Sequence, residues 1–296
     1  MSMAASYYAP TTLAEAESLL TAPPARLLVL AGGTDVMVRG REALRERSVL
    51  DVTRVAELSG VGEDGEALVL GAGVTYARCL ADPVVRRAAP LLADVAVRFA
   101  SPAIRNVATL GGNVVNASPA ADGVVALLAM DATVEAWTPS GRLRMALADA
   151  LVGPGQLSLP PGSLVTGFRV PVAVPREGAS FSKLVNRAYP EHPMAISVAS
   201  VAARLRLAAD GAVTLVRVVV GAVAPTPVRA ADAEAALLGQ PPTAERLAEA
   251  AALVARVARP IDDVRASAAY RRDVLPALAL AALERALDRA CRESAP

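Results

Sequence analysis

The sequence predicts an α+β protein built from two domains, and three observations carry this prediction. Short apolar runs of strand type alternate with glycine-rich turns and helices in the first part of the chain, a β-hairpin follows, and helices dominate the end. The change of pattern falls in the proline- and glycine-containing stretch Pro171–Gly178. We therefore place the domain boundary between residues 174 and 175, which gives domains 1–174 and 175–296.

The first domain is expected to mix strands and helices. Buried strands are predicted at Arg26–Leu30, Val49–Val52 and Ala67–Leu70, with a further strand-like segment at Ser163–Pro171. Helices are predicted at Leu13–Leu20, Tyr76–Leu80 and Leu91–Arg98.

The second domain is expected to be a sheet followed by helices. Strands are predicted at Phe181–Val185, Ile196–Leu207 and Val213–Val223, the last two joined by an Asp210-Gly211 turn that is typical of an antiparallel hairpin. Helices are predicted at Ala231–Leu238, Ala244–Ala258 and from Ser267 to about Ala290, with Pro276 as a point of interruption in the last.

The composition excludes several classes of protein. The 296 residues carry a formal net charge of +1, with 20% charged and 3% aromatic residues, which disfavours a nucleic-acid-binding protein. No run approaches the roughly 20 apolar residues that cross a bilayer, and the N-terminus has no signal-peptide pattern, so we expect a cytoplasmic protein. Cys79 and Cys291 lie far apart and cannot ligate an iron–sulfur cluster or zinc. We expect no metal site, and any redox centre must be an organic cofactor.

Two glycine loops are the most informative segments. Ala31-Gly32-Gly33-Thr34-Asp35 and Thr109-Leu110-Gly111-Gly112-Asn113 each join an apolar stretch to paired glycines and small polar residues. Glycine lets a phosphate approach the main chain and permits positive φ, and successive N–H groups in such a turn bind anions. Neither loop contains Lys or Arg, so the backbone and the side chains of Thr34, Thr109 and Asn113 would have to bind the phosphates. The alternative is that both are ordinary tight turns.

A third glycine-containing segment, Gly60–Gly65, matches the G-x-G-x-x-G pattern of dinucleotide-binding proteins by spacing alone. That fingerprint must follow a strand and begin a helix. Here the segment contains Asp64-Gly65 and leads into the strand predicted at Ala67–Leu70. We therefore predict a hairpin at this position.

The two loops carry a resemblance to a known family. The first loop and the segment Phe99–Asp122, which reads FASPAIRNVATLGGNVVNASPAAD, resemble the FAD-binding medium subunit of the molybdenum hydroxylases, the family of xanthine dehydrogenase and aerobic carbon monoxide dehydrogenase. Gly71–Thr75 and Arg265–Arg272 also fit the family, so the resemblance covers nearly the whole chain. It implies a two-subdomain FAD-binding domain of the PCMH type, then a smaller C-terminal domain of sheet and helices, with FAD in the cleft between them.

The resemblance also implies which residues bind FAD. The two loops would hold the diphosphate, Phe99 would lie near the flavin, Asp122 would fix the ribityl or flavin part, Val165 would contact FAD through its backbone, and Lys183 would face the flavin. The loop residues are Val29, Leu30, Ala31, Gly32, Gly33, Thr34, Asp35, Val36, Thr109, Leu110, Gly111, Gly112 and Asn113. A cation that faces the flavin, as Lys183 would, stabilises the anionic reduced form of the flavin.

Simpler interpretations exist for three of these residues. Phe99 could be a core side chain, Asp122 could favour a helix N-terminus, and Lys183 could be a solvated surface charge. The segment Arg187–Met194 departs from the family pattern, so the resemblance does not imply which oxidant this chain uses. His192, the only histidine, lies between two prolines and is expected to be a loop residue.

The family's division of labour implies an electron-transfer role. A large subunit with molybdopterin would oxidise the substrate, a small subunit with [2Fe-2S] clusters would relay electrons, and the FAD of this chain would deliver them to an external acceptor. We find no catalytic residue set in the sequence, in agreement with such a role. The alternatives are a stand-alone FAD-dependent oxidoreductase, which would need its own polar substrate pocket, and a non-redox nucleotide-binding module.

Overall fold

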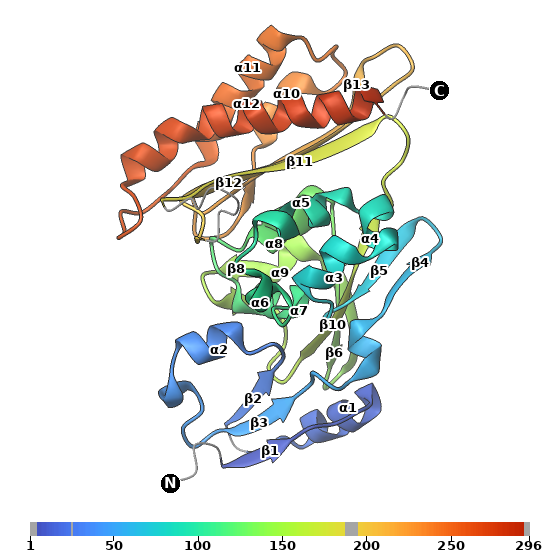
Figure 1. Ribbon diagram of the computed structural model, residues 1–296, viewed down its shortest axis with the longest axis vertical. Coiled ribbons are helices and arrows are strands. Elements are labelled where there is room, and N and C mark those ends of the chain that lie inside the picture. Colours follow the sequence, from blue (N-terminus) through green and yellow to red (C-terminus); the bar gives the residue numbers. More distant parts are fainter. Residues whose placement is uncertain (1–4, 25, 187–194, 293–296) are drawn as a thin grey trace.

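The computed structural model describes residues 5–24, 26–186 and 195–292. Figure 1 shows three parts stacked along the long axis: a small N-terminal sheet, a middle part with helices and a second sheet, and a C-terminal sheet covered by helices. The predicted α+β class is confirmed. The segment Arg187–Met194, with His192, lies outside the described residues.

The N-terminal subdomain is a three-stranded parallel sheet in the order β1-β3-β2. Its elements are β1 (Ser6–Tyr8), α1 (Leu13–Thr21), β2 (Leu27–Leu30), α2 (Thr34–Val38), the 3₁₀ turn Arg41–Ala43, β3 (Ser48–Asp51) and the 3₁₀ turn Ala56–Ser59. Helix α1 begins where the sequence allows a capping box, because Thr12 Oγ1 accepts from the N–H of Glu15, whose carboxylate accepts from the N–H of Thr12.

The middle subdomain is a five-stranded antiparallel sheet in the order β4-β5-β10-β6-β7, with helices packed on it. Its strands are β4 (Val61–Asp64), β5 (Ala67–Gly71), β6 (Thr133–Thr138), β7 (Gly141–Ala146) and β10 (Leu164–Pro171), beside the small hairpin of β8 (Leu151–Gly153) and β9 (Gln156–Leu157). Its helices are α3 (Tyr76–Ala81), α4 (Pro83–Ala88), α5 (Pro90–Arg98), α6 (Pro102–Arg105), α7 (Leu110–Asn116), α8 (Asp122–Ala129) and α9 (Leu147–Ala150).

The segment Gly60–Gly65 is a hairpin, as predicted. Strands β4 and β5 pair antiparallel across a turn in which Gly65 has a φ of 61°. No helix begins there, so the match to the dinucleotide-binding pattern is accidental.

The C-terminal part is a four-stranded antiparallel sheet in the order β11-β12-β13-β14. Its elements are β11 (Glu177–Leu184), β12 (Ala199–Leu207), β13 (Val213–Gly221), β14 (Val228–Arg229), α10 (Ala231–Leu237), α11 (Ala244–Leu253), the 3₁₀ turn Val254–Val257 and α12 (Ala268–Arg292). Alternate residues face opposite layers: Val201 and Ala203 pack with the helices, whereas Ala202 belongs to the core of the middle subdomain. The sheet is therefore buried on both faces.

Several sequence-based expectations about these elements were wrong. Strand β11 begins at Glu177, inside the stretch taken as linker, and an added Cβ at Gly178 would lie 2.0 Å from the Ala286 carbonyl oxygen, so α12 crosses the strand there. The helix predicted to end at Ala258 ends at Leu253 and continues as a 3₁₀ turn. Helix α12 runs through Pro276 without interruption. In the part of the chain that the structure describes, no helix has the length and apolarity to span a membrane.

Candidate functional site

The two glycine loops meet at the junction of the N-terminal and middle subdomains. The first loop follows β2 and leads into α2, and the second begins α7. An added Cβ at Gly32 would lie 1.7 Å from the carbonyl oxygen of Val107, just before the second loop. Only glycine permits this approach of the two backbones. The loops are therefore opposite walls of one site and not two independent turns.

The other three glycines have different roles. Gly33 has a φ of 70° and precedes α2, so it provides the left-handed conformation that the turn requires. Gly111 packs against the backbone of Ala72, whose carbonyl oxygen would lie 2.7 Å from an added Cβ. Gly112 is helical, and an added Cβ would meet only Thr109 Oγ1, at 3.0 Å. Positive φ is thus needed at Gly33 alone, whereas an added Cβ at Gly112 would crowd the Thr109 hydroxyl group.

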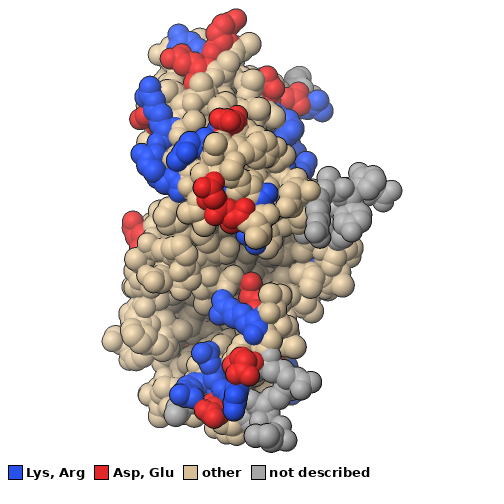
Figure 2. Space-filling model, turned by 90° about the vertical axis from the view of Figure 1, so that its left-hand side faces the viewer, with Lys and Arg blue, Asp and Glu red and all other residues tan. Residues whose placement is uncertain are grey.

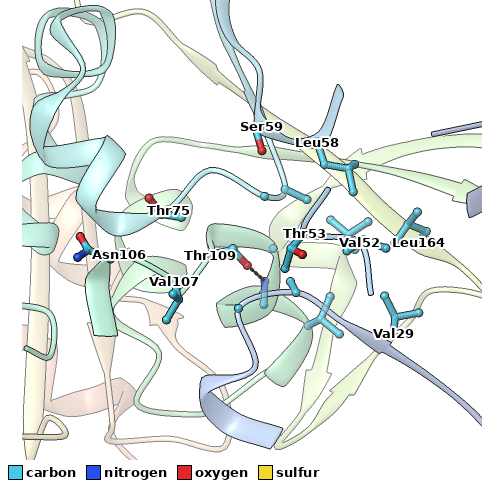
Figure 3. A pocket seen from close by; sticks show the side chains of 18 of the residues that line it. Val29, Val52, Thr53, Leu58, Ser59, Thr75, Asn106, Val107, Thr109 and Leu164 are labelled. Atoms are coloured by element: carbon cyan, nitrogen blue, oxygen red, sulfur yellow. Dashed lines mark hydrogen bonds between the residues drawn. The ribbon is translucent and has the colours of Figure 1, made fainter. Parts of the chain in front are cut away.

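Two adjoining cavities lie on either side of the loop contact. The larger has a volume of about 420 Å³ and lies between the subdomains (Figure 3). The smaller, of about 230 Å³, is lined by the whole first loop and by residues of α7. Both share the residues Val29, Ala31, Gly32, Thr109, Gly112 and Val115. A ligand longer than either cavity can therefore pass across the glycine loops.

Apolar side chains with a few hydroxyl groups line the larger cavity. Figure 3 shows Val29, Val52, Leu58 and Leu164 on one side and Thr75, Asn106 and Val107 on the other, with Thr109 between them. Thr109 Oγ1 accepts from the N–H of Gly112 at 2.9 Å, so this hydroxyl caps α7. Val165 lines the same cavity, beside an irregularity in the pairing of β10 with β6.

A cation lines the smaller cavity although neither loop contains one. Arg39, at the end of α2, donates from Nη2 to Asn116 Oδ1 at 2.7 Å, and Asn116 donates to Asp35 Oδ1 at 3.0 Å. This chain of contacts joins α2 to α7. Sequence reasoning missed Arg39 because it lies outside the glycine motif, whereas Asn116 lay in the recognised segment.

Phe99 also lines the smaller cavity, where its ring stacks on Tyr76 with centroids 3.8 Å apart and planes 5° from parallel. Burial raises the pKa of the Tyr76 hydroxyl well above its usual value, so it remains protonated. Among the described residues, this hydroxyl and Asn113 Oδ1 are buried polar atoms without a hydrogen-bond partner. Both lie within 3 Å of the point where Gly123 would carry a Cβ, at 2.0 and 2.7 Å.

Asp122 and Lys183 meet each other. Lys183 Nζ lies 2.8 Å from Asp122 Oδ2 and also donates to the carbonyl oxygen of Arg98 at 3.2 Å, and Ser197 Oγ donates to Asp122 Oδ1 at 2.7 Å. The side chain of Lys183 is 2% exposed, so it is not a solvated surface charge. It is also the only lysine in the chain. Asp122 does begin α8, so the helix N-terminus interpretation of this residue holds alongside the ion pair.

The structure brings together nearly all of the sequence-predicted residues. The first loop, Phe99, Thr109, Gly111, Gly112, Asn113 and Val165 line one or both cavities. Leu110 does not, because its side chain is fully buried in the core. Asp122 and Lys183 do not line these cavities either, but Lys183 contacts the carbonyl group that precedes Phe99.

The surface around the site carries few charges. Figure 2 shows Lys, Arg, Asp and Glu most densely on the upper and lower parts of this face, with fewer of them across its middle. Between Phe99 and Met130 the only charged residues are Arg105 and Asp122, and both are buried.

Comparisons with known proteins identify the family. Residues 2–173 match the family described as FAD binding domain in molybdopterin dehydrogenase, and residues 186–286 match the CO dehydrogenase flavoprotein C-terminal domain. The chain is 33% identical over 272 residues to a xanthine dehydrogenase FAD-binding subunit of Escherichia coli O157:H7, with 90% of both chains covered. It is 29% identical over 267 residues to the carbon monoxide dehydrogenase medium chain of Hydrogenophaga pseudoflava, covering 90% and 91% of the two chains.

Solved structures agree as well. A carbon monoxide dehydrogenase structure from Hydrogenophaga pseudoflava superposes with a TM-score of 0.90 at 29% identity, covering 96% of this chain and 97% of the other. Quinoline 2-oxidoreductase from Pseudomonas putida 86 gives a TM-score of 0.88 at 25% identity, with coverage of 96% and 97%. The chain therefore belongs to the family of FAD-binding subunits of the molybdopterin dehydrogenases, and its cofactor is FAD.

Proposed function

We propose that this chain holds FAD across the two adjoining cavities and passes electrons from the [2Fe-2S] clusters of a partner chain to an external acceptor. The observation that carries the proposal is the contact of two glycine loops between those cavities. When bound, FAD supplies the redox chemistry, and the protein contributes binding, orientation and electrostatics. Substrate oxidation would take place on a molybdopterin-containing large subunit.

The residues present fit FAD in size and chemistry. The larger cavity has apolar walls for an adenine ring and the hydroxyl groups of Thr53 and Ser59 for a ribose. Gly112 lies where both cavities meet and leaves room that a Cβ would occupy, which suits the diphosphate. Arg39 would supply the positive charge that the loops lack. We therefore place the adenosine half in the larger cavity.

The flavin half would then extend through the smaller cavity towards Phe99. Asn113 has a buried Oδ1 atom without a partner among the described residues, and a ribityl hydroxyl group could donate to it. Beyond Phe99 lies the Lys183–Asp122 pair, through the contact of Lys183 with the Arg98 carbonyl. This assignment gives Lys183 a position from which its charge acts on the flavin without direct solvent screening.

The partner roles follow from the relatives. Several are named as medium chains or as subunits of dehydrogenase complexes, which implies chains of other kinds beside them. For this chain we infer a molybdopterin-containing large subunit and a [2Fe-2S] small subunit.

Co-expression tests the proposal. The chain alone is expected to contain FAD and to show no substrate-dependent bleaching, whereas its complex with the molybdopterin and [2Fe-2S] subunits should bleach when substrate is added anaerobically. A complex with Gly112→Val provides the control, because its clusters should still be reduced while electron delivery to the acceptor is lost. Turnover of an organic substrate by the lone chain would instead establish a stand-alone oxidoreductase, and a chain that neither contains FAD nor takes it up would overturn the proposal.

A further inference from the structure

Helix α8 lies between the middle subdomain and the C-terminal sheet, and a carboxylate at each end binds the C-terminal part. All eight residues of the helix are buried. Its first residue, Asp122, pairs with Lys183 of β11. Asp131, two residues beyond its end, pairs with Arg217 of β13, with Oδ1 and Nε 2.7 Å apart. The end of α8 near the proposed flavin position and its opposite end thus both form ion pairs with the same C-terminal sheet.

The remote end is a network of charges. Besides Arg217, Arg204 of β12 and Arg229 of β14 approach Asp131, at 3.9 and 4.0 Å. Asp131 therefore faces one arginine from each of three adjacent strands. Arg204 is 3% exposed, and its Nη1 has no hydrogen-bond partner in the described part of the chain, so the carboxylate of Asp131 partly compensates a buried charge.

Two further carboxylates complete the network, and both belong to the C-terminal part. Glu177 accepts from Arg204 Nε at 2.7 Å and pairs with Arg206 at 3.0 Å, and Glu234 pairs with Arg229. Four arginines thus share three carboxylates. Asp131 is the member of this network that the middle subdomain contributes. The ion pairs of Asp131 therefore connect the network to that subdomain.

The backbone at Asp131 has a φ of 53°, in the left-handed region. Glycine would adopt this conformation most easily, but it would remove the carboxylate. Asp and Asn adopt it more readily than most other residues, so Asp131→Asn removes the charge without changing the backbone preference.

Between its two charged ends the interface is apolar and tight. Phe181, Ala202 and Val219 of the sheet belong to the same core cluster as α8, and an added Cβ at Gly221 would lie 2.5 Å from Val125 Cγ2. Close-packed surfaces of this kind move as units. A shift of the sheet at Asp131 would therefore be transmitted along β11 and β12 to Lys183 and Asp122.

We propose that Asp131 is a positioning residue: by anchoring the arginines of the C-terminal sheet, it holds that sheet in register on α8 and keeps the Lys183 ammonium group at Asp122. The expected effect of Asp131 on FAD binding rests on the proposed function, whereas its expected effect on the position of Lys183 does not. The proposal thus has two readouts, one in the chain without FAD and one with FAD.

The single lysine gives a direct measurement. When the full chain is labelled with [13C]lysine alone, the side-chain NMR signals report the surroundings of Lys183. In Asp131→Asn these signals are expected to shift in the folded FAD-free chain, and the dissociation constant of FAD is expected to rise about tenfold, a coupling typical of linked sites. Asp64→Asn is the control, because it removes an Asp–Arg pair of similar length, with Arg169 at 2.8 Å, that does not involve the C-terminal part.

The result that overturns the proposal is a folded Asp131→Asn chain of lower stability whose Lys183 signals match those of the wild type. If Asp131→Asn does not fold, Arg217→Gln replaces it, since Arg217 is partly exposed and donates the shortest bond to Asp131. In the double variant Asp131→Asn/Arg217→Gln, the Lys183 signals should shift no further than in whichever single variant shifts them more. Additive shifts would also overturn the proposal. If the Lys183 signals shift in Asp131→Asn while the affinity for FAD is unchanged, the role of Asp131 in positioning the sheet is supported and the assigned flavin position is refuted.

Discussion

Replacing Lys183 tests the buried ion pair, first in the protein without FAD. Its Nζ lies 2.8 Å from Asp122 Oδ2, and the two side chains are 2% and 5% exposed. Removing one member of such a pair leaves an uncompensated buried charge, which typically costs about 3–5 kcal/mol of unfolding free energy. Lys183→Met should therefore destabilise the chain by about that amount. Lys183→Met/Asp122→Asn should recover most of the loss, because no charge remains buried.

Equilibrium urea unfolding of the FAD-free variants measures both values. The exposed pair of Glu63 with Arg87 provides the control, and Glu63→Gln should change the unfolding free energy by less than about 1 kcal/mol. The reasoning is refuted if the effects of Lys183→Met and Asp122→Asn are additive in the double variant, since two charges that stabilise each other cannot act independently.

The same variants with FAD test the flavin position. A unit charge about 10 Å away at an effective dielectric constant of about 20 contributes about 1.7 kcal/mol, which corresponds to roughly 35 mV for a two-electron couple. Lys183→Met should therefore lower the flavin midpoint potential by a few tens of millivolts. The double variant should lie near the wild type, because the opposite charge is removed too. An unchanged or raised potential in Lys183→Met would show that Lys183 does not act on the flavin.

The remaining predictions concern the glycine loop, the identity of the cofactor and the two cysteines. Gly112→Val should abolish FAD binding at unchanged far-UV circular dichroism, whereas Gly62→Val, at a glycine with no atom within 4 Å of its Cβ position, should leave flavin content intact; full FAD occupancy in Gly112→Val would place the diphosphate elsewhere. Flavin extracted from the purified chain should be FAD and not FMN by chromatography, because the two adjoining cavities suit a dinucleotide. Burial raises the pKa of the Cys79 thiol to about 12, so a thiol reagent should label only exposed Cys291 in the native chain, and labelling of both would contradict this. Since the unfolded thiol ionises at lower pH, stability should fall above about pH 9, by at most about 1.4 kcal/mol per pH unit from this group.

Local patterns in the sequence determined the elements and the identity of the main loops. The helix at Leu13–Leu20, the Asp64-Gly65 turn and the hairpin across Asp210-Gly211 each depend on neighbours within a few residues, and the structure confirms all three. The glycine loops and the Phe99–Asp122 segment indicated an FAD site for the same reason, because their chemistry is contained in short contiguous stretches.

The tertiary structure decided what each glycine is for. From the sequence, the four loop glycines are equivalent; in the fold, Gly32 lets two backbones touch, Gly33 takes positive φ, Gly111 packs on Ala72 and Gly112 lies close to the Thr109 hydroxyl group. These roles depend on which backbone lies opposite. No local pattern contains that information.

Long-range charge pairing was likewise beyond the sequence. Lys183 and Asp122 are 61 positions apart, and Arg217 and Asp131 are 86 apart. Near-neutral composition offers 30 cations and 29 acids, and nothing local selects among their possible pairs. Packing of the C-terminal sheet against α8 makes the selection, because burying apolar residues such as Phe181 and Val219 fixes which charged residues at the edges of the interface come within reach of each other.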